Sequence, residues 1–209
     1  AIAERTAAAS LDAASAEWST AIRDIAAGAR YGGLTIVAQV GLRPLGLNAA
    51  GFAEFLHVQT GDMPERNAEG HHAINAASGI VLVLVPGGRI TTGALPGVAG
   101  RRSDEVRRDV HLEPFFIGKH EVTQAQWTRV MSVNPSFYRP MSSIRGPDRA
   151  IEFTLMHPVE SVSWHECREF TRRLGLCLPS EAQWEYACRG AATTRFIWGD
   201  EPACIQGRA

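Results

Sequence analysis

Three helix-start signals recur in the second half of the chain, and each pairs a hydroxyl residue with Gln or Glu three positions later. They are Thr123 with Gln126, Ser163 with Glu166, and Ser180 with Gln183. In such a capping box the hydroxyl accepts a hydrogen bond from the amide three residues on, while the Gln or Glu side chain reaches back to the first amide. Short segments with strand character alternate with the three predicted helices, and this pattern predicts an α+β domain.

The last of these helices has a marked start and a marked stop. Pro179 lies just outside its start, and Gly190 ends it, because glycine takes the left-handed conformation at no steric cost. Trp184, Ala187 and Cys188 follow at three- and four-residue steps and form one apolar stripe. The stripe predicted for the middle helix is Trp164, Cys167, Phe170 and Leu174. The predicted core residues are Ile80, Leu82, Leu84, Trp127, Phe170, Trp184 and Tyr186.

A continuous run of β-branched and leucine residues, Ile80–Val85, lies between Gly79 and the sequence Pro86-Gly87-Gly88. This pattern predicts a strand that is buried on both faces and closed by a turn. The two glycines lack the lysine and the Ser or Thr of a phosphate-binding loop, so we interpret them as part of that turn.

The first 80 residues carry weaker signals. Residues 3–28 are rich in alanine, with apolar residues at helical spacing, and they predict an amphipathic helix that ends at Gly28. Residues 34–40 predict a short strand, and residues 41–51 predict turns because they contain three glycines and a proline. Residues 62–78 and 141–152 are interpreted as surface loops, the second with a turn at Gly146-Pro147-Asp148.

Charge and hydropathy argue against two classes of partner. The 21 Lys and Arg residues nearly balance the 22 Asp and Glu residues, so the chain lacks the excess of positive charge that would attract nucleic acid or an acidic membrane. The Ile80–Val85 run is far too short to span a bilayer, and the first residues lack the layout of a secretory signal. We therefore expect a cytoplasmic protein with neither partner.

His165-Glu166 resembles part of a zinc-protease motif, but that motif needs a second histidine four residues after the first. The residue at that position is Glu169. Glu166 is better explained as the capping partner of Ser163. The pair His71-His72 lies in a polar stretch without a Cys, Asp or Glu at ligand spacing, so we interpret it as part of a solvated loop.

The four cysteines are Cys167, Cys177, Cys188 and Cys204, and their spacing contains no C-x-x-C pair. In a reducing cytosol all four are expected to be free thiols. Cys167 and Cys188 are predicted to lie on apolar helix faces, and no cysteine has neighbours that argue for a depressed pKa. We interpret all four as structural or incidental, and we predict no catalytic, cofactor-binding or metal-binding residue in this chain.

Four segments in order along the chain resemble the formylglycine-generating enzyme, or sulfatase-modifying factor, family. They are residues 115–127, 157–164, 178–190 and 196–200, roughly half of the chain. The chain departs from the family at Cys177, where the family usually has arginine, and at residues 90–93, where it usually has an aromatic residue and Met-Gly. The resemblance implies a C-type-lectin-like α+β fold.

Active members of this family are copper-dependent oxidases that convert a cysteine of a sulfatase peptide to formylglycine with molecular oxygen. Two late cysteines hold Cu(I), and calcium supports the loops. Those segments follow the Trp198-Gly199-Asp200 turn, and the present chain ends at Ala209. The resemblance therefore predicts the N-terminal part of a truncated oxidase domain, inactive as supplied, with copper and calcium expected only for a complete member and a protein or peptide as substrate.

Two other functions stay open. The first is a noncatalytic C-type-lectin-like binding module in a multidomain protein, because residues 51–61 resemble a flank of bacterial members, several of which carry a Ser/Thr kinase upstream. The second is an iron-dependent sulfoxide synthase relative. It ranks last, because His57, His71 and His72 lack the helical spacing of that branch's iron ligands.

We predict three parts: a helical flank or linker at 1–30, an N-terminal extension at 31–78, and the family-like portion at 79–209. A domain without its second half leaves apolar surface around Trp184, Phe196 and Trp198 uncovered. We therefore expect a marginally stable chain that self-associates. We also expect the residues after Asp200 to be poorly ordered and cleaved early by proteases.

Overall fold

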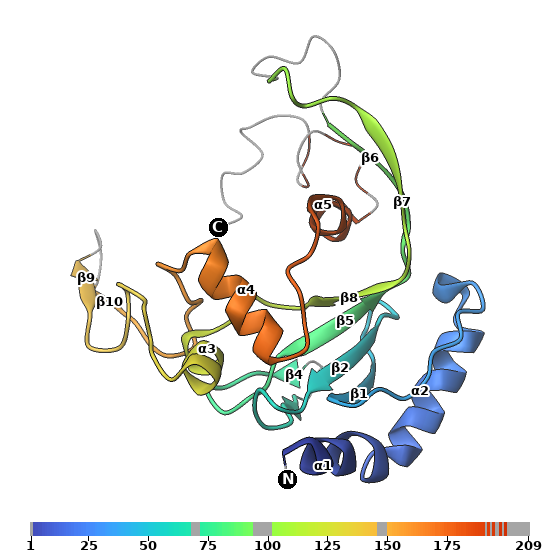
Figure 1. Ribbon diagram of the computed structural model, residues 1–209, viewed down its shortest axis with the longest axis horizontal. Helices are drawn as coiled ribbons and strands as arrows, with labels where there is room; N and C mark the ends of the chain where they lie inside the picture. The colour runs from blue at the N-terminus through green and yellow to red at the C-terminus, as the bar shows by residue number, and fades with distance from the viewer. Residues whose placement is uncertain are drawn as a thin grey trace. The chain divides into compact units, whose positions relative to one another are not determined.

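The computed structural model describes residues 2–67, 72–93, 102–145 and 150–190, together with 192, 194, 197 and 199 (Figure 1). The chain divides into two compact units. The first unit comprises residues 1–84 and 116–178, and the second comprises residues 85–115 and 179–209. The expected boundaries at residues 30 and 78 stay a prediction. Helices and antiparallel strand pairs are both present, which agrees with the α+β class.

The first unit begins with α1 (Ile2–Ala7), the π-helical turn η1 (Ala8–Asp12), α2 (Ser15–Ala27) and the short 3-10 helix η2 (Ala29–Tyr31). The predicted single helix is therefore interrupted, although α2 does end at Gly28. Trp18 and Ile25 are buried, as an amphipathic helix requires. The indole nitrogen of Trp18 donates to the carbonyl of Ser10 at 2.7 Å, which anchors α2 against η1.

A four-stranded sheet forms the middle of the first unit, in the order β1 (Leu42–Leu47), β2 (Ala53–His57), β5 (Val81–Val85) and β8 (Phe115–Gly118) (Figure 1). The predicted strand at Ile80–Val85 is confirmed as β5, and all but one of its residues are buried. The prediction of turns at residues 41–51 is confirmed only at its ends, because residues 41 and 49–50 are turns and β1 lies between them. β1 forms there because it pairs antiparallel with β2, and a bulge between Pro44 and Gly46 absorbs the turn-forming residues.

The strand predicted at residues 34–40 is wrong, because this fully described stretch has no strand assignment. Val37 and Val40 are exposed there. A β-branched sequence becomes a strand only when a neighbouring strand pairs with it, and that pairing is invisible in the local pattern.

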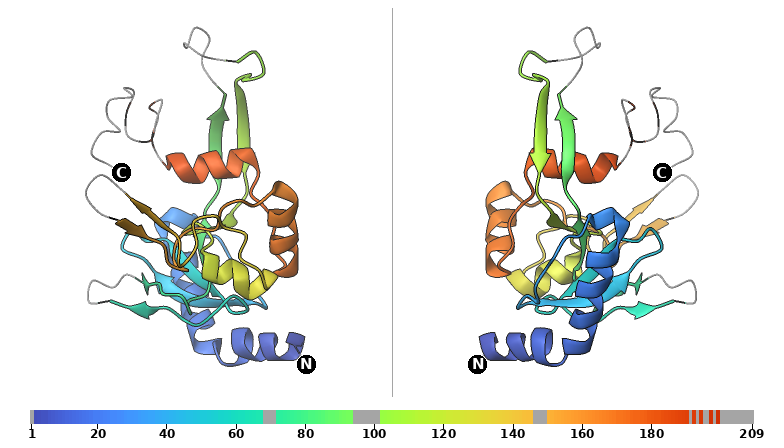
Figure 2. Two further views of the ribbon diagram at one scale, coloured as in Figure 1. Left: turned by 90° about the vertical axis from the view of Figure 1, so that its left-hand side faces the viewer. Right: turned by 90° about the vertical axis from the view of Figure 1, so that its right-hand side faces the viewer.

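Helices α3 (Gln124–Met131) and α4 (Trp164–Arg173) pack against each other, as both views in Figure 2 show. Both predicted capping boxes are confirmed, with Thr123 and Ser163 as the capping residues. The rings of Trp127 and Phe170 stack with centroids 4.9 Å apart and planes 4° from parallel. Trp164 is the exception on the predicted α4 stripe, because its side chain is exposed. The predicted core residues that are confirmed as buried are Ile80, Leu82, Leu84, Trp127 and Phe170.

Two segments expected to be loops contain short antiparallel pairs. β3 (Glu65–Arg66) pairs with β4 (His72–Ala73), and β9 (Ser143–Arg145) pairs with β10 (Ala150–Glu152). Both pairs sit within otherwise polar, irregular sequence, so no hydrophobic alternation reveals them.

The second unit contains the antiparallel pair β6 (Gly88–Thr92) and β7 (Arg108–Leu112), with helix α5 (Glu181–Arg189) beside it. The capping box of Ser180 and the stop at Gly190 are confirmed. All nine residues of α5 are described and none is buried, so the prediction that Trp184 and Tyr186 are core residues is wrong. Tyr186 is half-buried, because its hydroxyl donates to the carbonyl of Gly87, whereas Trp184 is 60% exposed. Residues two positions apart on a helix point about 200° apart around its axis. Because Tyr186 faces the hairpin, Trp184 points away from it.

Several expectations fall on residues outside the described part of the chain. They concern His71, Phe196, Trp198, Asp200, Cys204 and the tail at 201–209. The C-type-lectin-like fold and the truncation also stay predictions. None of the described helices is long and apolar enough to cross a membrane.

Candidate functional site

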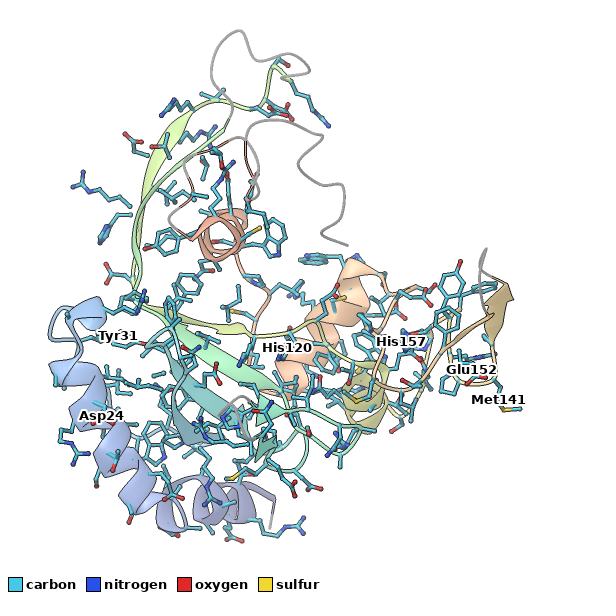
Figure 3. All side chains as sticks on the ribbon, turned by 180° about the vertical axis from the view of Figure 1, so that it is seen from behind. Asp24, Tyr31, His120, Met141, Glu152 and His157 are labelled. Atoms are coloured by element: carbon cyan, nitrogen blue, oxygen red, sulfur yellow. The ribbon has the colours of Figure 1, made fainter. Side chains whose placement is uncertain are left out.

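Four aromatic rings of the first unit contact one another in succession, and we call Phe137, Tyr138, Phe153 and His157 the ring ladder. Successive ring centroids are separated by 5.0, 5.0 and 5.2 Å. Phe137 is 72% exposed and Tyr138 is 40% exposed, and neighbouring Met141 is completely exposed. Figure 3 shows Met141, Glu152 and His157 at the same end of the first unit. An exposed group of this kind marks a binding surface more often than scattered single apolar residues do.

A set of polar side chains beneath the rings fixes the loop that carries Phe137 and Tyr138. We call Gln124, Asn134, Ser136 and Glu160 the polar lattice. Gln124 is fully buried, and its Nε2 donates to the carbonyl of Tyr138 at 2.7 Å. From the other side, the amide of Tyr138 donates to Oε1 of Glu160 at 2.8 Å. Both backbone polar groups of Tyr138 are therefore held by side chains from elsewhere in the chain.

The remaining lattice contacts close the arrangement. Asn134 Nδ2 donates to Gln124 Oε1 at 2.9 Å, and Asn134 Oδ1 accepts from the amide of Ser136 at 3.1 Å. The hydroxyl of Ser136, which is buried, accepts from the amide of Glu160 at 3.3 Å. Buried polar groups that are fully paired give a segment one preferred conformation. The backbone around Tyr138 is therefore held in place, although the rings of Phe137 and Tyr138 are exposed.

The far end of the ring ladder is fixed by a turn. The amide of Thr154 donates to Nδ1 of His157 at 3.0 Å, which orients the imidazole ring. The carbonyl of His157 accepts from the amide of Gln124 at 2.9 Å, so this turn is attached to the first residue of α3. The Ser161 hydroxyl and then the amide of Tyr138 lower the pKa of Glu160, which is therefore a carboxylate at neutral pH. The ladder itself offers ring faces, and it contains no nucleophile.

The cysteines that were weighed from the sequence do not form a reactive centre. Cys167, Cys177 and Cys188 are free, and Cys204 lies outside the described residues. Burial, followed by the charge of Glu166, raises the pKa of Cys167, so it is a neutral thiol at pH 7. Cys188 is exposed, not packed on an apolar face. Among the described residues, no three His, Cys, Asp or Glu side chains gather as a metal site.

The histidines also have structural explanations. His57 is buried, with Nε2 3.0 Å from the carbonyl of Leu174, and burial lowers its pKa. His165 is exposed, and Glu166 accepts from the amide of Ser163 at 2.8 Å, which confirms its capping role.

A cavity of about 350 Å³ lies between α2 and β1, but its carboxylates are already neutralised. Glu17 accepts from Arg43 Nη2 at 2.6 Å, Glu54 from Lys119 Nζ at 2.8 Å, and Asp24 from its neighbour Arg23 at 3.3 Å. The cavity therefore offers little unpaired charge for recognition, and the ring ladder is the stronger candidate.

Sequence reasoning missed the ring ladder, because its members lie up to 20 positions apart. One local signal was available: Asn134-Pro135-Ser136 predicts a helix stop, and two aromatic residues follow directly. Aromatic residues immediately after a turn signal are placed on a loop, where exposure indicates recognition.

Comparison with known proteins gives one family. Residues 71–207, more than half of the chain, match the family described as sulfatase-modifying factor enzyme 1-like domain. The formylglycine-generating enzyme of Streptomyces coelicolor is 52% identical over 46 residues, which cover 22% of this chain and 15% of that protein. The mouse (Mus musculus) formylglycine-generating enzyme is 44% identical over 57 residues, which cover 27% of this chain and 15% of that protein.

A longer match involves a protein of another kind. Serine/threonine-protein kinase pkn1 of Chlamydia pneumoniae is 30% identical over 135 residues, which cover 57% of this chain and 21% of that protein. The chain thus matches less than a quarter of the length of each of these three relatives.

Proposed function

The chain belongs to the sulfatase-modifying factor enzyme 1-like domain family, and from this premise we propose that its ring ladder binds an extended polypeptide for a sulfatase-modifying oxidase domain. The observation that carries the proposal is the rigid display of Phe137 and Tyr138. Both rings are exposed, while the backbone of Tyr138 is hydrogen-bonded on both sides by the polar lattice. A surface that is ordered before binding loses little conformational entropy when a partner docks.

The dimensions favour an extended chain as the occupant. Three centroid steps of about 5 Å give the ring ladder a contour of about 15 Å. A polypeptide in extended conformation rises about 3.3 Å per residue, so four or five residues match the ladder. Aromatic side chains are enriched among the residues that dominate protein recognition, which supports a polypeptide partner.

The oxidation chemistry is proposed for residues outside the described part of the chain. A Cu(I) site needs soft thiolate ligands. Among the described cysteines, Cys167 is a neutral thiol and Cys177 and Cys188 are free, and no three His, Cys, Asp or Glu side chains of the described residues gather as a metal site. We therefore assign neither the copper nor the calcium that the family implies to the described residues. Their proposed contribution is to hold the substrate, and no chemical step is assigned to them.

The second candidate function is a noncatalytic binding module in a multidomain protein. It is favoured by the match to serine/threonine-protein kinase pkn1, which extends over more of this chain than the matches to the two formylglycine-generating enzymes. The ring ladder would then hold a polypeptide without oxidising it. Both candidates use the same surface and differ in whether a cysteine is oxidised.

A titration tests the shared part of the proposal. The 209-residue chain is titrated with a fluorescent, cysteine-containing sulfatase peptide, and Tyr138→Ala is compared with the wild type. Loss of a central aromatic contact costs about 1 kcal/mol or more, so the dissociation constant should rise at least about fivefold. Trp184→Ala removes an exposed aromatic residue of the second unit and should leave binding unchanged. Equal affinities for Tyr138→Ala and the wild type, or the absence of binding, would refute the proposal for this peptide.

Mass spectrometry separates the two candidates. The protein is incubated with the same peptide, copper and oxygen, and the peptide is analysed for formylglycine. Conversion supports the oxidase. Binding without conversion supports the noncatalytic module.

A further inference from the structure

Met141 presents a long apolar side chain to solvent on an unfavourable backbone. Its exposed fraction is 104%, so no described residue covers it. Its φ is +74°, a conformation that brings the Cβ of an L-residue too close to the following carbonyl oxygen. The other two non-glycine residues with positive φ in the described part of the chain, Ser132 and Ser161, have small polar side chains. A methionine in this conformation is an outlier.

The turn around Met141 explains the positive φ but not the choice of methionine. The amide of Ser142 donates to the carbonyl of Arg139 at 2.9 Å, which closes a β-turn. Its two central residues are Pro140 and Met141, and proline followed by a positive φ is the signature of a type II turn. Glycine or asparagine is favoured at the second central position. Neither the backbone nor a contact with the described residues therefore favours methionine here.

The turn begins directly after Tyr138 and is attached to the ring ladder. The hydroxyl of Ser142 donates to the carbonyl of Phe137 at 3.3 Å. Because the polar lattice holds the backbone of Tyr138, Met141 extends from a fixed point at this end of the ladder. Figure 3 shows Met141 farther from the sheet than His157, which ends the ladder on the other side. The exposed large apolar residues between positions 133 and 155 are Val133, Phe137, Tyr138, Met141 and Leu155.

We propose that Met141 is the specificity anchor of the ring ladder: it selects polypeptides that carry an apolar side chain beside the four or five residues held by the rings. This inference rests on the proposed function and names the kind of sequence that is bound. A thioether on three rotatable bonds packs against aliphatic and aromatic side chains of different shapes. Docking removes the apolar surface of Met141 from water, which offsets the cost of its unfavourable conformation.

Fluorescence titration of the 209-residue chain with two peptides tests the anchor. Both contain the cysteine-containing sulfatase peptide, extended at both ends by Leu in one and by Asn in the other, so they differ in polarity and not in charge. The wild type should bind the Leu-extended peptide at least about fivefold more tightly. Met141→Gly should bind both peptides with nearly equal affinity. Met141→Leu should keep the preference, because leucine is also apolar.

Thermal unfolding of the same variants shows whether Met141 serves binding or folding. Glycine adopts a positive φ without strain, so Met141→Gly should raise Tm by about 2 °C. Met141→Leu keeps the strain and should leave Tm unchanged. A gain in stability together with a loss of selectivity identifies a residue that is kept for binding. A lower Tm for Met141→Gly would show that Met141 supports the fold and would overturn the anchor.

The outcomes of the titration separate the anchor from the proposed function. Equal affinity of the wild type for the two peptides, or a Met141→Gly variant that keeps the Leu preference, refutes the anchor alone when Tyr138→Ala still weakens binding. A wild type that binds neither peptide, or a Tyr138→Ala variant that binds as tightly as the wild type, refutes the proposed function and the anchor with it.

Discussion

The ammonium nitrogen of Lys119 lies 2.8 Å from Oε1 of Glu54, so a lysine just after β8 neutralises a carboxylate that is buried in β2. The two residues are 65 positions apart, and β5 lies between their strands in the sheet. Lys119 lies within residues 71–207, which match the family, whereas Glu54 precedes them. This ion pair therefore connects a strand that precedes the matched residues to a segment within them.

Replacement of Lys119 by alanine should destabilise the protein by about 3 kcal/mol, because it leaves the Glu54 carboxylate buried and unpaired. Urea denaturation at neutral pH measures the loss. Arg23→Ala is the matched control, because it removes the exposed partner of Asp24 and should cost under about 0.5 kcal/mol. A loss for Lys119→Ala as small as that of the control would show that Glu54 does not need its partner.

Trp127→Ala should cost about 3–5 kcal/mol, because Trp127 is buried and stacks on Phe170. Trp184→Ala removes the same side chain from an exposed position on α5 and should cost less than about 1 kcal/mol. Chemical denaturation of both variants gives the comparison. A large loss for Trp184→Ala would place Trp184 in a core and would restore the prediction made from its helical stripe.

Gly87→Ala should be more damaging than Gly175→Ala. Both glycines have positive φ, at +76° and +70°, but a Cβ at Gly87 would lie 2.3 Å from the carbonyl oxygen of Leu112, whereas the space at Gly175 is open. Gly175→Ala therefore costs only the backbone strain of about 1–2 kcal/mol, whereas Gly87→Ala adds a clash with fixed backbone. Hydrogen exchange in β6–β7 and in α4 measures the two effects. Equal losses of exchange protection in the two regions would show that the turn at Gly87 can shift.

The helices could be predicted from the sequence in detail, because capping is a local interaction. Thr123, Ser163 and Ser180 each lie three residues before the side chain that completes the box, so the signal and its cause occupy the same short segment. Burial of the helix stripes could be predicted less well. Phe170 is covered by Trp127, but Trp184 faces away from the hairpin that holds Tyr186.

The sheet and the candidate site depend on partners far away in the chain. β1 exists because β2 pairs with it, although Pro44 and Gly46 look like turn residues. The ring ladder exists because Gln124 and Glu160 fix the backbone of Tyr138 from both sides. No local periodicity encodes either arrangement, so the structure was needed to find them.

The central claim is that the ring ladder is the surface that holds a polypeptide, and hydrogen exchange with and without a saturating sulfatase peptide tests it most directly. We predict slower exchange in residues 136–142 and 153–160 when the peptide is bound, with no change in α5. Protection should disappear in Tyr138→Ala while its exchange without peptide matches that of the wild type. Protection confined to α5 or to the β6–β7 pair, with the ring ladder unaffected, would contradict the account.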